Sequence, residues 1–362
     1  MHILHVVGAR PNFMKAAPVL RALSAYPEVR QTLVHTGQHY DASMSDVFFR
    51  QLEMPEADVN LGVGSGTHGQ QTAAVMTAFE PVVIERKPHL VLVYGDVNST
   101  LAAALVCAKL AIPVGHVEAG LRSRDHSMPE EINRLLTDRL SDFLFTPSED
   151  GDQNLLSEGI PQSRIHLVGN VMIDTLVRLL PKADPQLPDG VNSRFALVTL
   201  HRPSNVDDLS WLRDLLATLA DLSDQLSVIF PVHPRTRHRL NDLGIDHSAN
   251  ARLHLREPLP YLEFIGLQRH AAVVITDSGG IQEETTFLGV PCLTVRENTE
   301  RPVTISLGTN QLVGRDLQKL RTSAEAILQQ KPSMQDAQRP IPLWDGHAAE
   351  RIARIIARGS SN

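Results

Sequence analysis

The chain has 362 residues, of which 42% are hydrophobic and 21% are charged, and its formal net charge is −7. This length is that of two domains, and the composition is that of an ordinary globular protein. The negative balance gives no overall basic field that would attract nucleic acid or a membrane surface, so neither is expected as a partner. An anionic ligand would have to be held by locally placed groups.

Strand-like and helix-like segments alternate in the first half of the chain. Residues 2–8 (HILHVVG), 90–96 (LVLVYGD) and 112–120 (IPVGHVEAG) are apolar runs typical of buried strands. Residues 13–26 and 99–111 have the apolar spacing of helices. Such alternation predicts a parallel sheet with helices on both faces.

The second half of the chain repeats this alternation of strands and helices. Strands are predicted at residues 195–201, 226–233, 272–277 and 291–295, with a helix over 209–223 and a short helix between the last two strands. The segments that begin at Leu90 and at Ala272 each run from an apolar strand ending in Asp, through a helix, to a Pro-led strand. The similarity of these two segments indicates that the chain has two similar halves, although unrelated βαβ units also look alike.

The domain boundary is predicted from composition. The segment PKADPQLPDGVNS, Pro181 to Ser193, is rich in Pro, Asp and Gly and reads as a linker. We expect one domain over residues 1–180, a second over 181–342, and an amphipathic helix within 343–362 that packs back onto the first domain.

Both cysteines, Cys107 and Cys292, lie in apolar runs, which indicates buried, reduced thiols and favours a cytoplasmic location. The first residues have no basic region of a signal peptide, and no apolar run approaches the length of a membrane span. His35 and His39 lack the convergent partners of a metal site, so no metal is expected. The glycine fingerprints of dinucleotide-binding and P-loop proteins are also missing from the sequence, so we expect no cofactor.

The segment VVITDSGGIQEETTFLGVP places Ser278, Gly279 and Gly280 between a strand and a helix. Ligands of parallel sheets bind at this position, where glycines let a phosphate approach the backbone and the helix offers free N–H groups. Glu283 or Glu284 could then accept hydrogen bonds from the hydroxyl groups of a ribose or sugar. The alternative is an Asp or Ser helix cap followed by glutamates that the helix dipole favours.

Cationic side chains also follow predicted strands. Arg10 and Lys15 flank the Pro-led turn of VGARPNFMK, where two cations would suit a diphosphate, although a solvated pair is the simpler explanation. LVTLHRPSN places His201 and Arg202 at another strand end, and TERPVT adds Arg301.

Carboxylates end the strands of the first half. Asp96 follows the apolar run LVLVYG and Glu118 follows IPVGHV, near the ends of two predicted strands, and Glu130 and Glu131 open a Pro-led helix in PEEINR. Clustered carboxylates are costly unless they transfer protons or bind cations, which makes them candidates for acid–base chemistry. One of the two adjacent glutamates could equally be a plain helix-start acid.

The motifs GARPNFMK, GHVEAGLRS, PEEINR, LHRPSN, TDSGGIQEE and TERPVT, together with Gly95–Asp96, closely resemble the non-hydrolysing UDP-N-acetylglucosamine 2-epimerases. They occur in that family's order over nearly the whole chain. The resemblance implies a glycosyltransferase-B-like fold with two Rossmann-like domains and the active site in the cleft between them. It also implies interconversion of UDP-GlcNAc and UDP-ManNAc by a cytoplasmic homodimer.

The resemblance further implies site residues. The catalytic group would be Asp96, Glu118, Glu130 and His201, and the UDP-sugar contacts would be Arg10, Lys15, Phe264, Ser278, Gly279, Gly280, Glu284 and Arg301. The chain departs from the family pattern at Ser204, where many members have an acid, and at Asp41, where many bacterial members have Gln. The second departure puts the family's allosteric UDP-GlcNAc site in doubt.

The chemistry expected is elimination and re-addition of UDP through a 2-acetamidoglucal, with separate acid–base groups for the two faces of C2. Four alternatives stay open: an epimerase of a related diacetamido or uronic UDP-sugar, a hydrolysing 2-epimerase, a glycosyltransferase of the same fold, and a non-catalytic sugar-nucleotide sensor. A sensor would have little use for four candidate acid–base residues. The aromatic content is only 4%, which argues against a glycosyltransferase, because the acceptor groove of such an enzyme is often lined by apolar or aromatic side chains.

Overall fold

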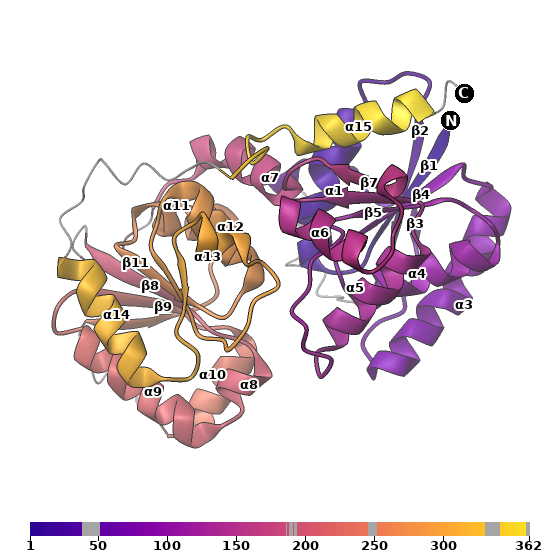
Figure 1. The fold of residues 1–362 in the computed structure, drawn as a ribbon. Coiled ribbons are helices and arrows are strands. Elements are labelled where there is room, and N and C mark those ends of the chain that lie inside the picture. Colours follow the sequence, from indigo (N-terminus) through magenta and orange to yellow (C-terminus); the bar gives the residue numbers. More distant parts are fainter. Residues whose placement is uncertain are drawn as a thin grey trace. The chain divides into compact units, whose positions relative to one another are not determined.

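A computed structural model describes residues 1–37, 51–185, 187, 191, 194–244, 252–329 and 341–359. Its contacts divide the chain into two compact units (Figure 1). The first unit comprises Met1–Arg178 and Pro342–Asn362, and the second comprises Leu179–Ile341. Asp41 and His39 lie outside the described residues.

The first unit is built on a parallel sheet of seven strands in the order β3-β2-β1-β4-β5-β6-β7. Its strands are β1 (His2–Val7), β2 (Arg30–His35), β3 (Val59–Asn60), β4 (Leu90–Tyr94), β5 (Val114–Val117), β6 (Phe143–Thr146) and β7 (Ile165–Leu167). Its helices are α1 (Arg10–Leu23), α3 (His68–Arg86), α4 (Asn98–Lys109), α5 (Pro129–Leu140), α6 (Glu149–Ser157), α7 (Val171–Leu179) and α15 (Ala348–Gly359), with a 3-10 turn at Gln162–Arg164. The first helix begins at Arg10, three residues before the predicted start, because Pro11 suits the first turn of a helix.

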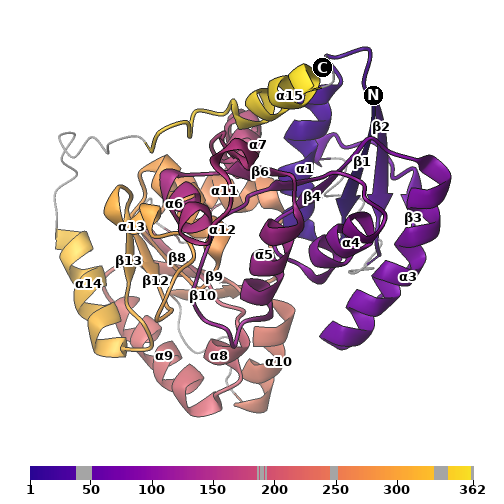
Figure 2. The ribbon, with the colours of Figure 1, turned by 45° about the vertical axis from the view of Figure 1, so that its right-hand side comes forward.

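The second unit has a parallel sheet of six strands in the order β10-β9-β8-β11-β12-β13. Its strands are β8 (Phe195–Thr199), β9 (Ser227–Pro231), β10 (Leu253–Arg256), β11 (Val273–Thr276), β12 (Cys292–Thr294) and β13 (Asn310–Leu312). Its helices are α8 (Pro203–Val206), α9 (Leu209–Leu222), α10 (Pro234–Asp242), α11 (Tyr261–His270), α12 (Gly279–Leu288), α13 (Val303–Ser306) and α14 (Leu317–Gln329), with a 3-10 turn at Leu180–Lys182. Helices α9 and α14 contact each other beside this sheet (Figure 2).

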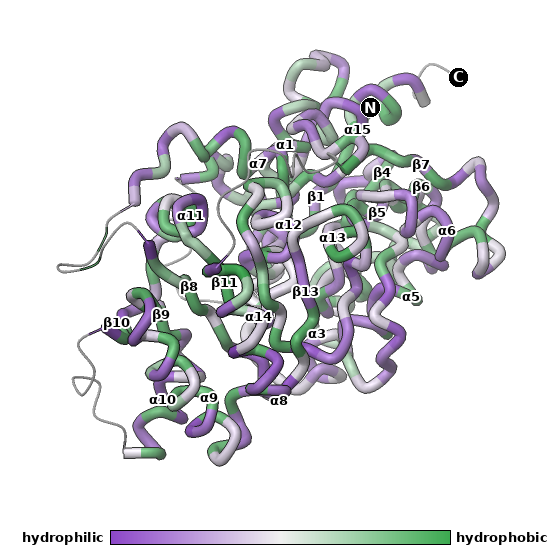
Figure 3. The backbone as a smooth tube through the Cα atoms, turned by 60° about the vertical axis from the view of Figure 1, so that its left-hand side comes forward, coloured by the Kyte–Doolittle hydropathy of each residue, from purple (hydrophilic) through white to green (hydrophobic). Residues whose placement is uncertain are grey.

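The central strands are apolar on both faces, as parallel strands covered by helices must be. Every residue of β1, β4 and β5 is buried, as is every residue of β9 and β11. The hydropathy colouring accordingly runs green along β8 and β11 (Figure 3). Cys107 and Cys292 are free, buried thiols, as the sequence predicts.

The two sheets share one topology. In each, the first strand in the chain lies third in the sheet, and a chain reversal places β4 beside β1 and β11 beside β8. The two segments that echo each other in sequence, β4-α4-β5 and β11-α12-β12, therefore occupy equivalent places. Ligands of open α/β sheets bind at this reversal, beyond the carboxyl ends of the strands.

The terminal helix α15 belongs to the first unit and lies along α1 (Figure 1). Asp174 of α7 holds its first turn, because its carboxylate accepts the backbone N–H groups of Ala348 at 3.1 Å and Ala349 at 2.7 Å. Trp344 adds a hydrogen bond from its indole N–H to the Pro147 carbonyl at 2.9 Å. Within the described part of the chain, no helix has the length and apolarity to cross a membrane.

Candidate active site

The predicted residues of the first unit gather where β1, β4 and β5 end. Arg10 opens α1 after β1, Asp96 follows β4 by two residues, and Glu118 follows β5 directly. Lys15 lies one turn further into α1, and its side chain is buried rather than solvated. The structure thus brings cations and carboxylates together at the chain reversal of this sheet.

Lys15 of α1 reaches the ends of β4 and β5. Its ammonium donates to Glu118 Oε1 at 2.7 Å, and both side chains are almost fully buried. A Cβ atom at Gly95, which has φ +62°, would lie 2.6 Å from Lys15 Nζ, so only glycine leaves room for this ammonium beside β4. Glu118 itself has φ 75°, an unfavourable conformation for a residue with a side chain, which is typical of functional sites.

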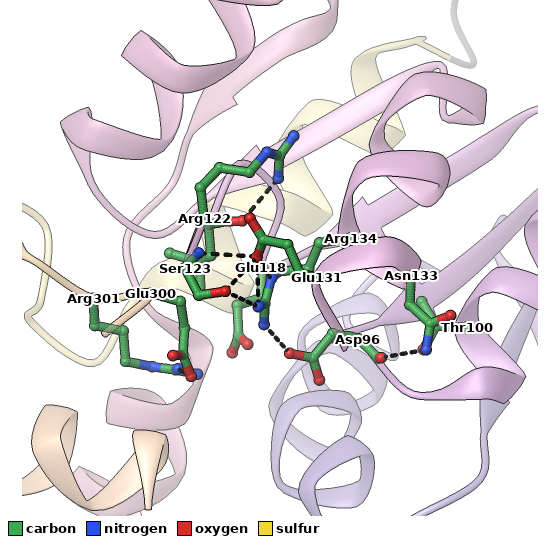
Figure 4. A network of polar contacts seen from close by, with 12 residues as sticks. Asp96, Thr100, Glu118, Arg122, Ser123, Glu131, Asn133, Arg134, Glu300 and Arg301 are labelled. Atoms are coloured by element: carbon green, nitrogen blue, oxygen red, sulfur yellow. Dashed lines mark hydrogen bonds and ion pairs between the residues drawn. The ribbon is translucent and has the colours of Figure 1, made fainter. Parts of the chain in front are cut away.

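Asp96 is bound to α5 through two neighbouring residues (Figure 4). The guanidinium of Arg134 donates to Asp96 Oδ2 at 2.5 Å, and the amide of Asn133 donates to the backbone carbonyl of Asp96 at 2.9 Å. The Asp96 side chain keeps 22% of its surface exposed, whereas that of Arg134 keeps 2%. The carboxylate of Asp96 is therefore held by a buried cation and remains partly exposed to solvent.

The adjacent glutamates of α5 have different environments, which the sequence could not assign. Glu131 is buried and accepts the backbone N–H groups of Ser123 and Arg124, the Ser123 hydroxyl and the Arg134 guanidinium. Burial opposes its ionisation, but these hydrogen bonds hold the pKa of Glu131 below its ordinary value. Glu130 is half-buried, and within the described residues its side chain makes no hydrogen bond or ion pair. The structure leaves Glu130 available for chemistry and uses Glu131 to hold the Ser123–Arg124 loop.

A second buried network supports the same strand ends. His116 of β5 contacts the Gly95 carbonyl at 2.8 Å and Asp138 at 2.6 Å, and Asp138 also accepts from Arg122 at 2.7 Å. Burial opposes ionisation of Asp138, but His116 and Arg122 hold its pKa below the usual range. This network therefore holds Gly95, which precedes Asp96, and His116, which lies two residues before Glu118.

In the second unit, β8 ends at a histidine–aspartate pair. His201 Nδ1 lies 2.9 Å from Asp277 Oδ1, and Asp277 also accepts from the backbone N–H groups of His201 and Arg202 and from the Asn205 amide. Burial opposes ionisation of Asp277, but these partners hold its pKa below its ordinary value. The His201 side chain remains 40% exposed, so the buried carboxylate orients a ring that can still reach a ligand.

Ser278 precedes the first residue of α12, but its side chain makes no capping hydrogen bond. The carboxylate of Asp277 instead accepts hydrogen bonds from the His201 backbone, just after β8, and from the Asn205 amide of α8. The simple Asp or Ser cap considered for this segment is thus not what forms. Gly279 and Gly280 open the helix. A Cβ atom at Gly279 would collide with the guanidinium of Arg301 and lie 2.7 Å from Glu300 Oε1, so a side chain here would have to displace the buried ion pair beside it.

Arg301 is 6% exposed and lies between two carboxylates. Its Nε is 2.8 Å from Glu283 Oε1, and its Nη1 pairs with Glu300, which also pairs with Arg296 at 2.7 Å. Figure 4 shows the Arg301–Glu300 pair. The sequence predicted Arg301 as a ligand contact, whereas the structure shows that it also neutralises buried acids.

Glu284 lies inside the second unit, and its Oε1 accepts the Tyr261 hydroxyl at 2.8 Å. Burial raises the pKa of Glu284 to about 7, although the hydrogen bond from Tyr261 opposes the shift. Phe264, one turn along α11 from Tyr261, is half-buried and packs against the core cluster that contains Phe195 and Leu197. Ser204, the predicted departure from the family pattern, is exposed on α8.

The chain is similar to known proteins over nearly its whole length. A family model described as UDP-N-acetylglucosamine 2-epimerase matches residues 21–357. The chain is 40% identical to the UDP-N-acetylglucosamine 2-epimerase of Methanocaldococcus jannaschii, over 99% of this chain and 100% of that protein. It is also 40% identical to the UDP-2,3-diacetamido-2,3-dideoxy-D-glucuronate 2-epimerase of Pseudomonas aeruginosa, again over 99% of this chain and 100% of that protein.

The fold agrees with these relatives. The crystal structure of the Methanocaldococcus jannaschii UDP-GlcNAc 2-epimerase in complex with UDP-GlcNAc and UDP superposes with a TM-score of 0.90. It is 40% identical, and the match covers 99% of this chain and 100% of that chain. The predicted fold class, two Rossmann-like α/β domains of the glycosyltransferase-B type, is confirmed.

Proposed function

Because this chain belongs to the UDP-N-acetylglucosamine 2-epimerase family, we propose that it is a non-hydrolysing epimerase that interconverts UDP-GlcNAc and UDP-ManNAc. One observation carries the proposal: two carboxylates at neighbouring strand ends are each held by a buried cation. These pairs are Asp96 with Arg134 and Glu118 with Lys15. Fixed carboxylates are what proton transfer at a sugar carbon requires.

The proposed reaction is elimination followed by re-addition. A carboxylate oxygen takes the proton from C2, the C2–H electron pair becomes the C1–C2 double bond, and the C1–O bond breaks as UDP leaves with its electron pair. A proton then adds to the opposite face of C2, and UDP re-forms the bond to C1. Two faces need two acid–base groups, and Asp96, Glu118 and Glu130 are the candidates.

The groups of the second unit are assigned to the nucleotide. Ser278, Gly279, Gly280 and the start of α12 offer N–H groups to the diphosphate, and His201, oriented by Asp277, would stabilise the departing UDP together with Arg10 and Arg301. Glu284 would accept the ribose hydroxyls beside Phe264.

Proton NMR in D₂O tests this function directly. We expect purified protein incubated with UDP-GlcNAc to form UDP-ManNAc, with deuterium at C2 of both epimers, because elimination exposes that proton to exchange through the carboxylates. An epimer that fully retains its C2 hydrogen would contradict elimination. Release of free N-acetylmannosamine and UDP would instead identify a hydrolysing enzyme.

A second substrate is favoured by one observation, the equal 40% identity to the Pseudomonas aeruginosa enzyme that is named for a diacetamido uronic sugar. The same experiment with UDP-2,3-diacetamido-2,3-dideoxy-glucuronate decides between the two. The preferred substrate is the one with the higher kcat/KM when both are present together.

The position of Glu284 predicts a pH-dependent affinity for UDP. Ribose hydroxyls bind an ionised carboxylate better than a protonated one, so binding should favour the ionised form of a group whose pKa is about 7 in the free protein. Affinity should therefore rise about tenfold between pH 6 and pH 8. The folding stability of the free protein has the opposite pH dependence. Because the pKa of Glu284 is raised in the folded state, the stability that Glu284 contributes is present at low pH and is lost as pH rises through about 7.

Calorimetric titration of UDP at several pH values measures this effect, with Glu284→Gln as the matched control. The phosphate groups of UDP titrate equally against both proteins, so the difference between the two curves belongs to Glu284. Parallel curves would remove Glu284 from the ribose site.

A further inference from the structure

Arg134 is the largest fully buried side chain among the described residues. It lies on α5, and its guanidinium makes contacts in two directions. Nε and Nη2 donate to Glu131 Oε2 at 3.1 and 2.7 Å, while Nη1 donates to Asp96 Oδ2 at 2.5 Å. One planar cation therefore bridges a structural carboxylate and a candidate acid–base carboxylate (Figure 4).

The two carboxylates differ in how far they are exposed to solvent. Glu131 has hydrogen bonds from the Ser123 and Arg124 backbone in addition to Arg134, and it is 1% exposed. The Asp96 side chain is 22% exposed. Since Glu131 fixes the guanidinium, Arg134 presents a stationary charge and a hydrogen-bond donor to Asp96. An arginine remains protonated at any pH at which the enzyme would work.

We propose that Arg134 is a positioning residue that holds Asp96 ionised and in one orientation, so that Asp96 enters the reaction as a proton acceptor. The inference rests on the function proposed above. A nearby cation favours the charged form of a carboxylate, and a guanidinium anchored to Glu131 through Nε and Nη2 does so without the mobility of a lysine ammonium. Asn133, the preceding residue on the same helix, fixes only the backbone of Asp96.

Arg134→Gln tests the proposal through the pH profile of kcat/KM. The acidic limb, where the proton acceptor becomes protonated, should move to higher pH by about one to three units, because one opposite charge in contact shifts a carboxylate by that amount. Arg134→Lys keeps a charge that can serve only one of the two carboxylates. It should lower kcat and give a limb between those of the unchanged protein and Arg134→Gln.

Asn133→Ala is the matched control. It lies next to Arg134 on α5, it is also buried, and it touches the same residue, but it carries no charge. Its loss should lower kcat by moving Asp96 while leaving the acidic limb in place. A limb that moves equally in Asn133→Ala and Arg134→Gln would overturn the proposal, because it would reflect general disturbance of α5.

A readout independent of turnover separates this inference from the proposed function. In protein labelled with [¹³C]aspartate, the Asp96 carboxyl signal is identified by its absence from Asp96→Asn, and its titration is followed in the unchanged protein, Arg134→Lys and Arg134→Gln. We expect the midpoint to rise by about one to three pH units in Arg134→Gln. An unchanged midpoint in a folded variant overturns the inference whether or not the protein epimerises any sugar, and the conservative Arg134→Lys answers the question if Arg134→Gln does not fold.

Discussion

Asp96→Asn is expected to lower the rate of epimerisation about 10²–10⁴-fold, the usual contribution of a positioned acid–base group. Affinity for UDP should stay close to that of the unchanged protein, because Asp96 is assigned to C2 of the sugar and not to the nucleotide. The substitution is nearly isosteric, and the amide oxygen can still accept from Arg134, which donates to Asp96 Oδ2. Loss of activity would then report lost proton transfer and not a collapsed site.

Asp142→Asn is the control for this experiment. Asp142 lies at the opposite, amino-terminal end of the strands of the same sheet, where its carboxylate accepts the Val114 N–H at 2.9 Å at the start of β5. It should keep full activity. Steady-state rates with UDP-GlcNAc and calorimetry with UDP measure both variants, and an Asp96→Asn protein with a rate within about tenfold of the unchanged protein would remove Asp96 from proton transfer.

The sequence placed Asp96, Glu118 and Ser278 correctly at strand ends, because each apolar run stops just before them. Parallel sheets bury their strands on both faces, so the position where an apolar run ends is readable without a structure. The sequence also predicted the alternation of strands and helices around that edge. Which ligand each residue contacts stays a prediction.

The choice between Glu130 and Glu131 could not be made from position alone. It depends on which face of α5 points inward. Spacing from Arg134 did not decide it either, because Glu131 is three residues before this arginine and Glu130 is four, and both spacings bring a side chain onto the same side of a helix. Only the packed structure shows that Arg134 pairs with Glu131.

Other partners depend on long-range pairing that periodicity does not encode. His201 and Asp277 are 76 residues apart, and they meet because β8 and β11 pair with Thr199 opposite Thr276. The same holds for Lys15 and Glu118, which are 103 residues apart in the chain. Lys15 illustrates the physical reason: a lysine near a turn is usually solvated, and only the packed sheet shows that its ammonium has a buried carboxylate to neutralise.

Arg301→Ala is expected to destabilise the second unit by about 3–5 kcal/mol, a larger effect than the loss of one ligand contact. The sequence alone suggested that this change would mainly weaken UDP binding. The structure places the guanidinium between Glu283 and Glu300, whose side chains are 1% and 4% exposed. Without Arg301, buried carboxylates lose part of their compensation and must either be protonated or gain access to water.

The two tryptophans allow this effect to be located, because Trp211 lies in the second unit and Trp344 in the first. In a Trp344→Phe background, the fluorescence of Trp211 follows urea unfolding of the second unit alone. Its transition should move to lower urea in Arg301→Ala, whereas Trp344 fluorescence in a Trp211→Phe background should not change.

Arg321→Ala is the control, since Arg321 pairs with Asp221 on the surface of the same unit, where both side chains are exposed. An exposed pair contributes about 0–1 kcal/mol, so its removal should leave the transition almost in place. UDP affinity of Arg301→Ala has to be measured below the unfolding transition, because a partly unfolded second unit would mimic lost binding. If Arg301→Ala is as stable as Arg321→Ala but binds UDP more weakly, Arg301 acts on the ligand alone, and the buried carboxylates beside it are neutralised by other means.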